Sequence, residues 1–187
     1  MHFRKMRTRL LSWLCLTLVS GLFLTSCSEE LDFDQADELQ VTPTISSSLL
    51  YLETPEDYIN GIPVGTFLTE LFQFEAFSED FIADNVLEGT ITYEYENTTS
   101  KDLQLTVEFL DSAGEVLDME DFLIDAPSGV VSREVLYGMG GKSLDILRNT
   151  TQLRLSGANL GDNTSTSAAP EPKFILRSSA AFRLQLQ

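Results

Sequence analysis

The 187-residue sequence contains few of the side chains that perform most enzyme chemistry. It has one histidine, one tryptophan and two cysteines, namely His2, Trp13, Cys15 and Cys27. Residues 28–187 therefore hold no imidazole, indole or thiol group. Residues 28–187 can therefore carry neither Ser-His-Asp nor Cys-His catalysis. They also cannot form internal disulfides or zinc sites built on histidine or cysteine. Packing and hydrogen bonding must hold this part of the chain together.

Basic residues are also scarce, because 12 Lys and Arg stand against 29 Asp and Glu. Four of the basic residues lie at Arg4, Lys5, Arg7 and Arg9. Beyond position 26 there remain eight basic and 29 acidic residues, a net charge of −21. Nucleic acids and anionic lipid headgroups both need basic surfaces on the proteins that bind them. We therefore expect no nucleic-acid partner and no charge-driven binding to a membrane.

One apolar run, Leu10 to Leu24, follows the basic residues. It is shorter than the roughly 20 residues of a membrane-spanning helix, and a basic segment followed by such a run is typical of a signal peptide. The run ends in Leu24-Thr25-Ser26-Cys27, which resembles the bacterial lipobox. The resemblance implies palmitate-type acyl chains on Cys27 and removal of residues 1–26. The alternatives are an ordinary signal peptide with a chance cysteine, and an uncleaved anchor.

Residues 27–40 are strongly acidic and predict a solvated tether. Ser28, Glu29 and Glu30 resemble the export signal that carries Bacteroidetes-type lipoproteins to the outer face of the outer membrane. The sequence departs from the familiar signal at Ser28, where that signal often has Lys or Gln. We expect a surface-exposed protein, with a periplasm-facing anchor as the alternative.

Residues 41–187 alternate between short apolar patterns and turn clusters, which favours an all-β, mainly antiparallel fold. We expect a two-sheet, Ig-like β-sandwich with one or two short helical turns. The predicted strands lie near residues 45–52, 62–74, 90–96, 103–109, 116–124, 130–137, 152–156 and 174–186.

In two of these strands, 90–96 and 103–109, apolar and polar residues alternate with a period of two. A short segment that contains the turn Asn97–Ser100 separates them. They are predicted to pair as an antiparallel hairpin. Ser143 is predicted to cap a short helix, as is Ser78. Residues 161–172 are polar and without period, which indicates an exposed, mobile loop.

Two motifs invite a ligand hypothesis and fail on spacing. Gly138–Ser143 ends like a phosphate-binding loop, but Leu136 occupies the position of the required first glycine, so a flexible connection is favoured. Asp32–Asp37 begins like a calcium loop, but Ala36 and Asp37 replace a ligand and the glycine. We expect no metal site and no cofactor.

Carboxylate groups could in principle run hydrolysis without histidine. The candidates are Asp118, Glu120 and Asp121, and Glu79, Asp80 and Asp84, for which we favour a solvated acidic face. A sugar-binding tyrosine platform is disfavoured, because Tyr93 and Tyr95 share a predicted core face with Ile91. Ser112, in Asp111-Ser112-Ala113, resembles the O-glycosylation motif of exported Bacteroidetes-type proteins and lies in a predicted turn.

The signal, the tether and the stretch Phe81–Phe109, with Glu94–Thr98 inside it, resemble a family of small, uncharacterised Bacteroidetes-type outer-membrane lipoproteins. The resemblance implies an outer-membrane-anchored β domain and carries no activity or ligand. We expect a non-enzymatic, structural or ligand-binding lipoprotein held on the membrane by acyl chains at Cys27. The alternatives are an accessory subunit that binds a protein or glycan partner, and a carboxylate-only hydrolase.

Overall fold

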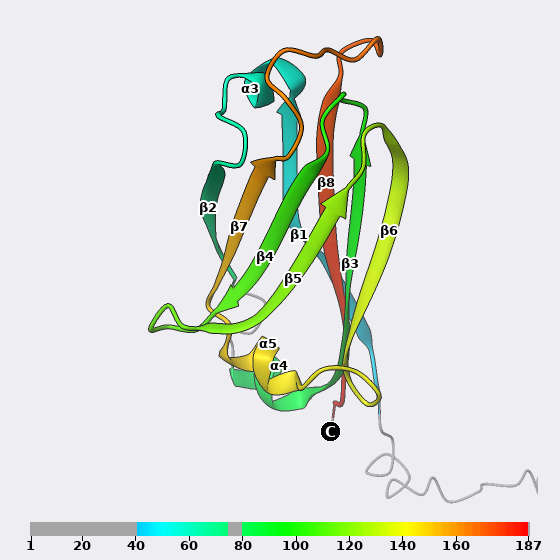
Figure 1. Ribbon diagram of the computed structural model, residues 1–187. Coiled ribbons are helices and arrows are strands. Elements are labelled where there is room, and N and C mark those ends of the chain that lie inside the picture. The colour runs from blue at the N-terminus through cyan, green and yellow to red at the C-terminus, as the bar shows by residue number, and fades with distance from the viewer. Residues whose placement is uncertain (1–40, 75–79, 187) are drawn as a thin grey trace, which may run out of the picture. The chain divides into compact units, whose positions relative to one another are not determined.

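The computed structural model describes residues 41–74 and 80–186. The part from Gln40 to Gln187 is one compact unit. The described residues form the strands and short helices shown in Figure 1: β1 (Thr44–Pro55), α3 (Glu56–Asn60), β2 (Phe67–Gln73), α4 (Asp80–Asn85), β3 (Val86–Asn97), β4 (Leu103–Leu110), β5 (Val116–Ile124), β6 (Ser128–Gly138), α5 (Leu144–Asn149), β7 (Gln152–Asn159) and β8 (Lys173–Leu184). None of the helices described is long and apolar enough to cross a bilayer.

The strands form two four-stranded antiparallel sheets that face each other (Figure 1). One sheet has the order β1-β8-β3-β6 and the other has the order β2-β7-β4-β5. The prediction of an all-β, two-layer sandwich is confirmed. The strand order corrects the expected Ig-like topology, because the chain passes between the sheets in the manner of an eight-stranded jelly roll and not in the seven-stranded Ig arrangement.

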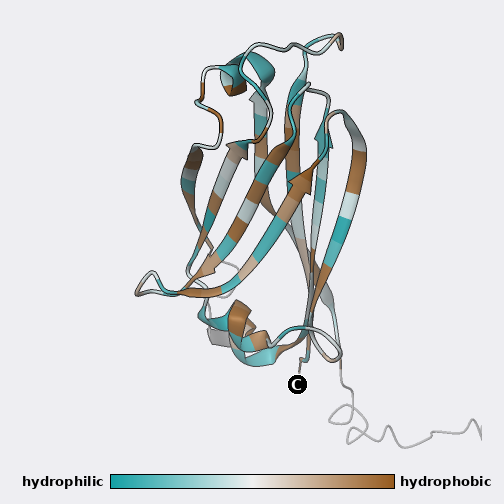
Figure 2. Cartoon of the chain, viewed as in Figure 1, coloured by the Kyte–Doolittle hydropathy of each residue, from teal (hydrophilic) through white to brown (hydrophobic). Residues whose placement is uncertain are grey.

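The core lies between the inner faces of the sheets, where alternate residues of each strand meet. In β4, Leu105, Val107 and Phe109 are buried while Glu108 between them is not, and Figure 2 shows this banding along the strands. Aromatic rings join the layers, with Tyr93 of β3 lying 5.1 Å from Phe122 of β5 between ring centroids. The period of two in the sequence therefore identifies the buried faces correctly.

The predicted hairpin between residues 90–96 and 103–109 is wrong. β3 pairs with β6 and β8, whereas β4 pairs with β5 and β7. The bend between β3 and β4 is a crossing from one sheet to the other, held by the fully buried side chain of Asn97. Its amide donates to the carbonyl oxygens of Lys101 and Asp125, and its oxygen accepts from the backbone and hydroxyl of Thr99.

The helices lie at the two ends of the sandwich. α3 is at one end, beside the loop that precedes β8, and α4 and α5 are at the other (Figure 1). The prediction that Ser143 caps a helix is confirmed, because its hydroxyl accepts from the backbone N–H of Asp145 at the start of α5. The predicted cap Ser78 lies outside the described residues.

Candidate functional site

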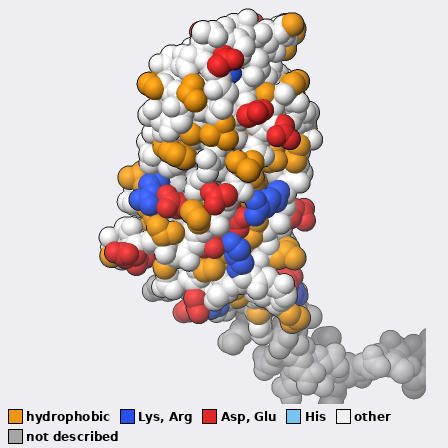
Figure 3. Space-filling model, in the orientation of Figure 1, with side chains coloured by type: hydrophobic (Ala, Val, Ile, Leu, Met, Phe, Trp, Pro, Cys, Tyr) orange, Lys and Arg blue, Asp and Glu red, His pale blue; other side chains and the backbone are white. Residues whose placement is uncertain are grey.

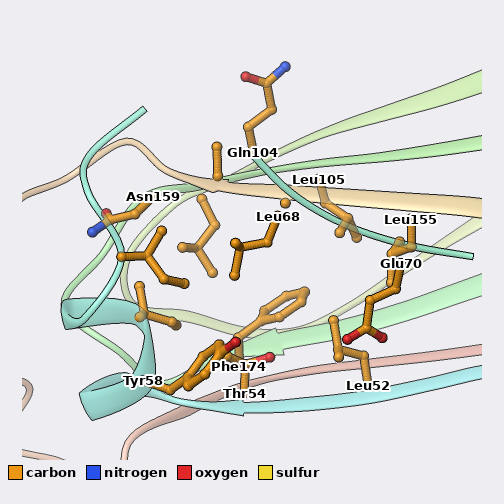
Figure 4. A pocket seen from close by; sticks show the side chains of 15 residues that line it. Leu52, Thr54, Tyr58, Leu68, Glu70, Gln104, Leu105, Leu155, Asn159 and Phe174 are labelled. Atoms are coloured by element: carbon orange, nitrogen blue, oxygen red, sulfur yellow. The ribbon is translucent and has the colours of Figure 1, made fainter. Parts of the chain in front are cut away.

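A sandwich of two open sheets has two open sides, and here they differ in chemistry. On one side, between β1 and β2, the structure leaves a pocket of about 120 Å³ near α3 (Figure 4). The pocket reaches the inner faces of both sheets. Its apolar lining includes Leu52 of β1, Ile59 of α3, Leu68 of β2, Leu105 of β4, Leu155 of β7 and Phe174 of β8.

The inner face of β7 lacks a side chain at one position of this pocket, which leaves room there. Leu153 and Leu155 fill the interior, but the next inward residue is Gly157. Gly157 lies opposite Leu68 of β2 and Leu105 of β4. Leu68 faces inward from an edge strand, lines the pocket and has 39% of its surface exposed. A glycine inside a strand weakens it and often marks a place where a ligand approaches closely.

The lining also includes polar residues from five elements: Thr54 of β1, Tyr58 of α3, Glu70 of β2, Gln104 of β4 and Asn159 of β7. Glu70 shares the inward face of β2 with Leu68, and in Figure 4 its side chain extends from β2 toward β1. Within the described part of the chain, the Glu70 carboxylate has no hydrogen-bond or ion-pair partner. This pocket therefore combines an apolar floor with an unpaired negative charge at its mouth.

The opposite open side, between β5 and β6, is closed by an ion network. Asp118 and Glu120 point inward from β5, where Lys142 donates to both at 2.6 and 2.5 Å. Arg133 of β6 also pairs with Glu120, and its guanidinium lies 4.9 Å from the centre of the Phe122 ring. Burial opposes the charge of Lys142, but its hydrogen bonds to the two carboxylates outweigh this and raise its pKa.

This network overturns the prediction that Asp118 and Glu120 form a solvated face. Glu120 is only 2% exposed, and each of the two carboxylates is already bound to a cation. Asp121 faces the other way and accepts from the Thr106 hydroxyl. Of the second predicted group, Asp84 is exposed, Glu79 lies outside the described residues, and so does the side chain of Asp80. In the ranges 41–74 and 80–186, no three or more His, Cys, Asp or Glu side chains are grouped so that they could hold a metal ion.

A second buried cluster, which the sequence did not indicate, lies at the α3 end. Glu56 accepts from Ser100 and from the backbone N–H of Ser167. Burial would raise the pKa of Glu56, but these hydrogen bonds outweigh it and lower the pKa. Lys101, whose side chain is fully buried, donates to Asp162 and Ser165. The predicted mobile loop, residues 161–172, is therefore bound to α3 and to the β3–β4 crossing.

The remaining predicted residues do not form a site with the pocket. In Gly138–Ser143, Lys142 is held in the ion network, and Gly138 and Lys142 are joined by a backbone hydrogen bond, so the segment is a tight turn. Tyr93 is buried as predicted, and Tyr95 is partly buried against the core. Ser112 is exposed in the β4–β5 turn, and its modification stays a prediction.

The predicted lipidation site and its neighbours lie outside the described residues. These are Leu24, Thr25, Ser26 and Cys27, the export-signal residues Ser28, Glu29 and Glu30, and the segment Asp32–Asp37.

The fold and the pocket define the class: an antiparallel jelly-roll sandwich with a small apolar pocket at one open side. No protein-family model matches the chain. No curated protein matches it either.

Among solved structures, the chain is similar to the VP2 subviral particle of infectious bursal disease virus, with 11% identity and a TM-score of 0.37 over 78% of this chain. It spans 33% of that viral chain. A protein from Parabacteroides distasonis described as secreted has 15% identity and a TM-score of 0.43, over 62% of this chain and 37% of its own. The Bacillus endospore appendage pilus protein has 8% identity and a TM-score of 0.34. The match covers 79% of this chain and 92% of the pilus protein. Likenesses this distant carry no information on function.

Proposed function

We propose that this protein is a lipoprotein of the bacterial cell envelope whose jelly-roll domain is a ligand-binding component without catalytic activity. The observation that carries the proposal is the order of features at the N-terminus: a basic segment, an apolar run and Leu24-Thr25-Ser26-Cys27. Acyl chains on Cys27 hold the protein on the outer membrane. Each buried methylene contributes about 0.8 kcal/mol, so two or three chains give a stable attachment.

The binding role is supported by the difference between the two open sides of the sandwich. The β5–β6 side carries charged groups that are paired with one another, whereas the β1–β2 side retains a pocket and the unpaired Glu70. Concave apolar sites with a few polar groups are the usual form of small-molecule sites. The pocket is therefore the site where we expect a ligand.

A second candidate function, an accessory subunit that binds a protein partner, is favoured by the outer face of β2. Phe67 and Leu71 lie there with 51% and 59% of their surfaces exposed, on an edge strand that pairs, among the described strands, with β7 alone. Unpaired edges with exposed apolar side chains are typical places for another chain to bind.

The attachment is tested by metabolic labelling with an alkyne fatty acid in three versions of the full chain. We expect the wild type and the control Cys15→Ala to carry label and to partition with membranes, because Cys15 lies within the segment that is removed. Cys27→Ala should carry none. Label retained by Cys27→Ala would contradict the anchor.

Surface display is tested separately by protease treatment of intact cells. We expect the wild type to be digested while a periplasmic marker stays intact. The double variant Glu29→Ala/Glu30→Ala should become protected if these acidic residues form the export signal. Protection of the wild type would favour the periplasm-facing alternative.

A further inference from the structure

We propose that the pocket between β1 and β2 binds a small hydrophobic cation, with one ring or branched alkyl group inside and an ammonium group at Glu70. This inference rests on the binding role proposed above and specifies the class of ligand. Its support comes from the size of the pocket, from the glycine that lines it and from the charges around it.

The size of the pocket fits a single ring. Its volume is about 120 Å³, and an apolar cavity of about 150 Å³ is known to take benzene. Leu155 and Phe174 form part of an apolar floor, so a ring that enters exchanges water for hydrocarbon contacts.

The glycine at position 157 indicates that the pocket is specified by the sequence of β7. A Cβ added to Gly157 would meet nothing closer than 3.8 Å, so steric fit alone does not require a glycine there. Its backbone is not in the left-handed region that favours glycine. A larger side chain would nevertheless project into the pocket and fill it. The absence of a side chain at this position therefore costs strand stability and keeps the pocket open.

The charges around the pocket favour a cation over an anion. All eight basic residues in the described part of the chain are engaged in ion pairs with acidic neighbours. Figure 3 shows basic side chains on one face lying next to acidic ones. Glu70, by contrast, has no partner in the described residues and lies at the mouth of the pocket. Tyr58 lines the same pocket, and an aromatic ring also attracts a cation.

The test uses residues 28–187, which contain the whole compact unit Gln40–Gln187. Protonated benzylamine, benzyl alcohol and benzoate carry the same ring with a positive, neutral or negative group. Each is titrated at pH 7 while the methyl NMR signals of Leu68 and Leu155 are followed. We expect benzylamine to bind about fivefold more tightly than benzyl alcohol, the effect of one partly exposed ion pair, and benzoate to bind most weakly.

Two variants and two controls assign the effect to the pocket. Glu70→Gln should remove the preference for benzylamine over benzyl alcohol, and the control Glu134→Gln, on the opposite edge at β6, should keep it. Gly157→Val should abolish binding of all three probes. Gly129→Val places the same side chain in open space and should bind as the wild type does. Thermal unfolding of each variant shows that it is folded.

The outcomes separate the ligand class from the binding role. If benzyl alcohol binds as tightly as benzylamine and Gly157→Val abolishes both, the pocket is a site but the cationic class is overturned. If no probe shifts these signals, or if Gly157→Val binds normally, the pocket is not the site. Both this inference and the proposed binding role then fail, while the lipid anchor is tested independently by its label.

Discussion

At the scale of single residues, Lys101 shows what sequence patterns cannot reveal. It lies in a short polar segment between two strands, where a lysine is usually exposed. Its ammonium group is instead buried and donates to Asp162 and Ser165, more than 60 residues away in the sequence. The same holds for Glu56, whose partners Ser100 and Ser167 lie 44 and 111 residues further along. No local pattern encodes such pairs.

We expect Lys101→Met to lower the free energy of unfolding by about 2 kcal/mol, because the partly buried carbonyl oxygen of Ser165 loses a charged donor at 2.7 Å and keeps only the Asn60 amide at 3.4 Å. Asp162 is largely exposed, so water compensates its lost partner and limits the effect. The control is Lys173→Met, whose ion pair with Glu53 is partly exposed and should contribute less than about 1 kcal/mol. Urea unfolding measures both, and equal losses would contradict a special role of Lys101.

At the scale of elements, the sequence predicts the strands and their buried faces but not their partners. Period-two alternation identifies β3 and β4 and places Ile91 and Val107 in the core. It does not say that the bend at Asn97 crosses between sheets, because both pairing schemes bury the same faces. The pocket was missed for a related reason. The predicted strand 152–156 stops one residue before Gly157, although a glycine after alternating leucines was a usable signal.

The connection from β6 to α5 also differs from its prediction. The sequence predicts a flexible segment at Gly138–Ser143, and the structure has a tight turn there. A Cβ on Gly141 would lie 2.2 Å from the Leu136 carbonyl oxygen, which cannot move without breaking its hydrogen bond from Lys142. We expect Gly141→Ala to cost more than about 3 kcal/mol. Gly140→Ala is the control: its φ of 81° is strained for alanine, but the space is open, so about 1 kcal/mol is expected. Thermal unfolding compares them, and similar losses would contradict this account of the turn.

At the scale of the whole molecule, the two open sides of the sandwich differ: one is closed by ion pairs and the other retains a pocket. Charged groups at β5 and β6 are paired with one another and close one side, so the layers are joined there by Lys142 and Arg133. The β1–β2 side stays partly open beside α3. Ion pairs between the layers constrain the distance between β5 and β6, whereas no ion pair among the described residues joins β1 to β2 across the pocket.

The distribution of charge over the whole molecule also predicts how stability depends on pH. The pKa is lowered for Glu56, for Asp162 and for the paired carboxyl groups Glu53, Glu88 and Glu108. In the unfolded chain these groups titrate near 4.5 for Glu and 3.8 for Asp, so below these values the unfolded state binds more protons. Their contribution is complete above about pH 4.5 and is lost as the pH falls further.

Buried tyrosines impose the opposite limit. Burial raises the pKa of Tyr93 and Tyr137 above their ordinary value of 10.0, so their contribution is complete below pH 10 and is lost above it. We expect a plateau of the free energy of unfolding between about pH 4.5 and pH 10, measured by urea unfolding in about 0.15 M salt to screen the net negative charge. Glu56→Gln should make only the acid limb less steep and Tyr137→Phe only the alkaline limb, so each variant is the control for the other. A stability that rises as the pH falls from 4.5 would mean that relief of repulsion among the excess carboxylates outweighs these hydrogen bonds, and it would overturn the prediction.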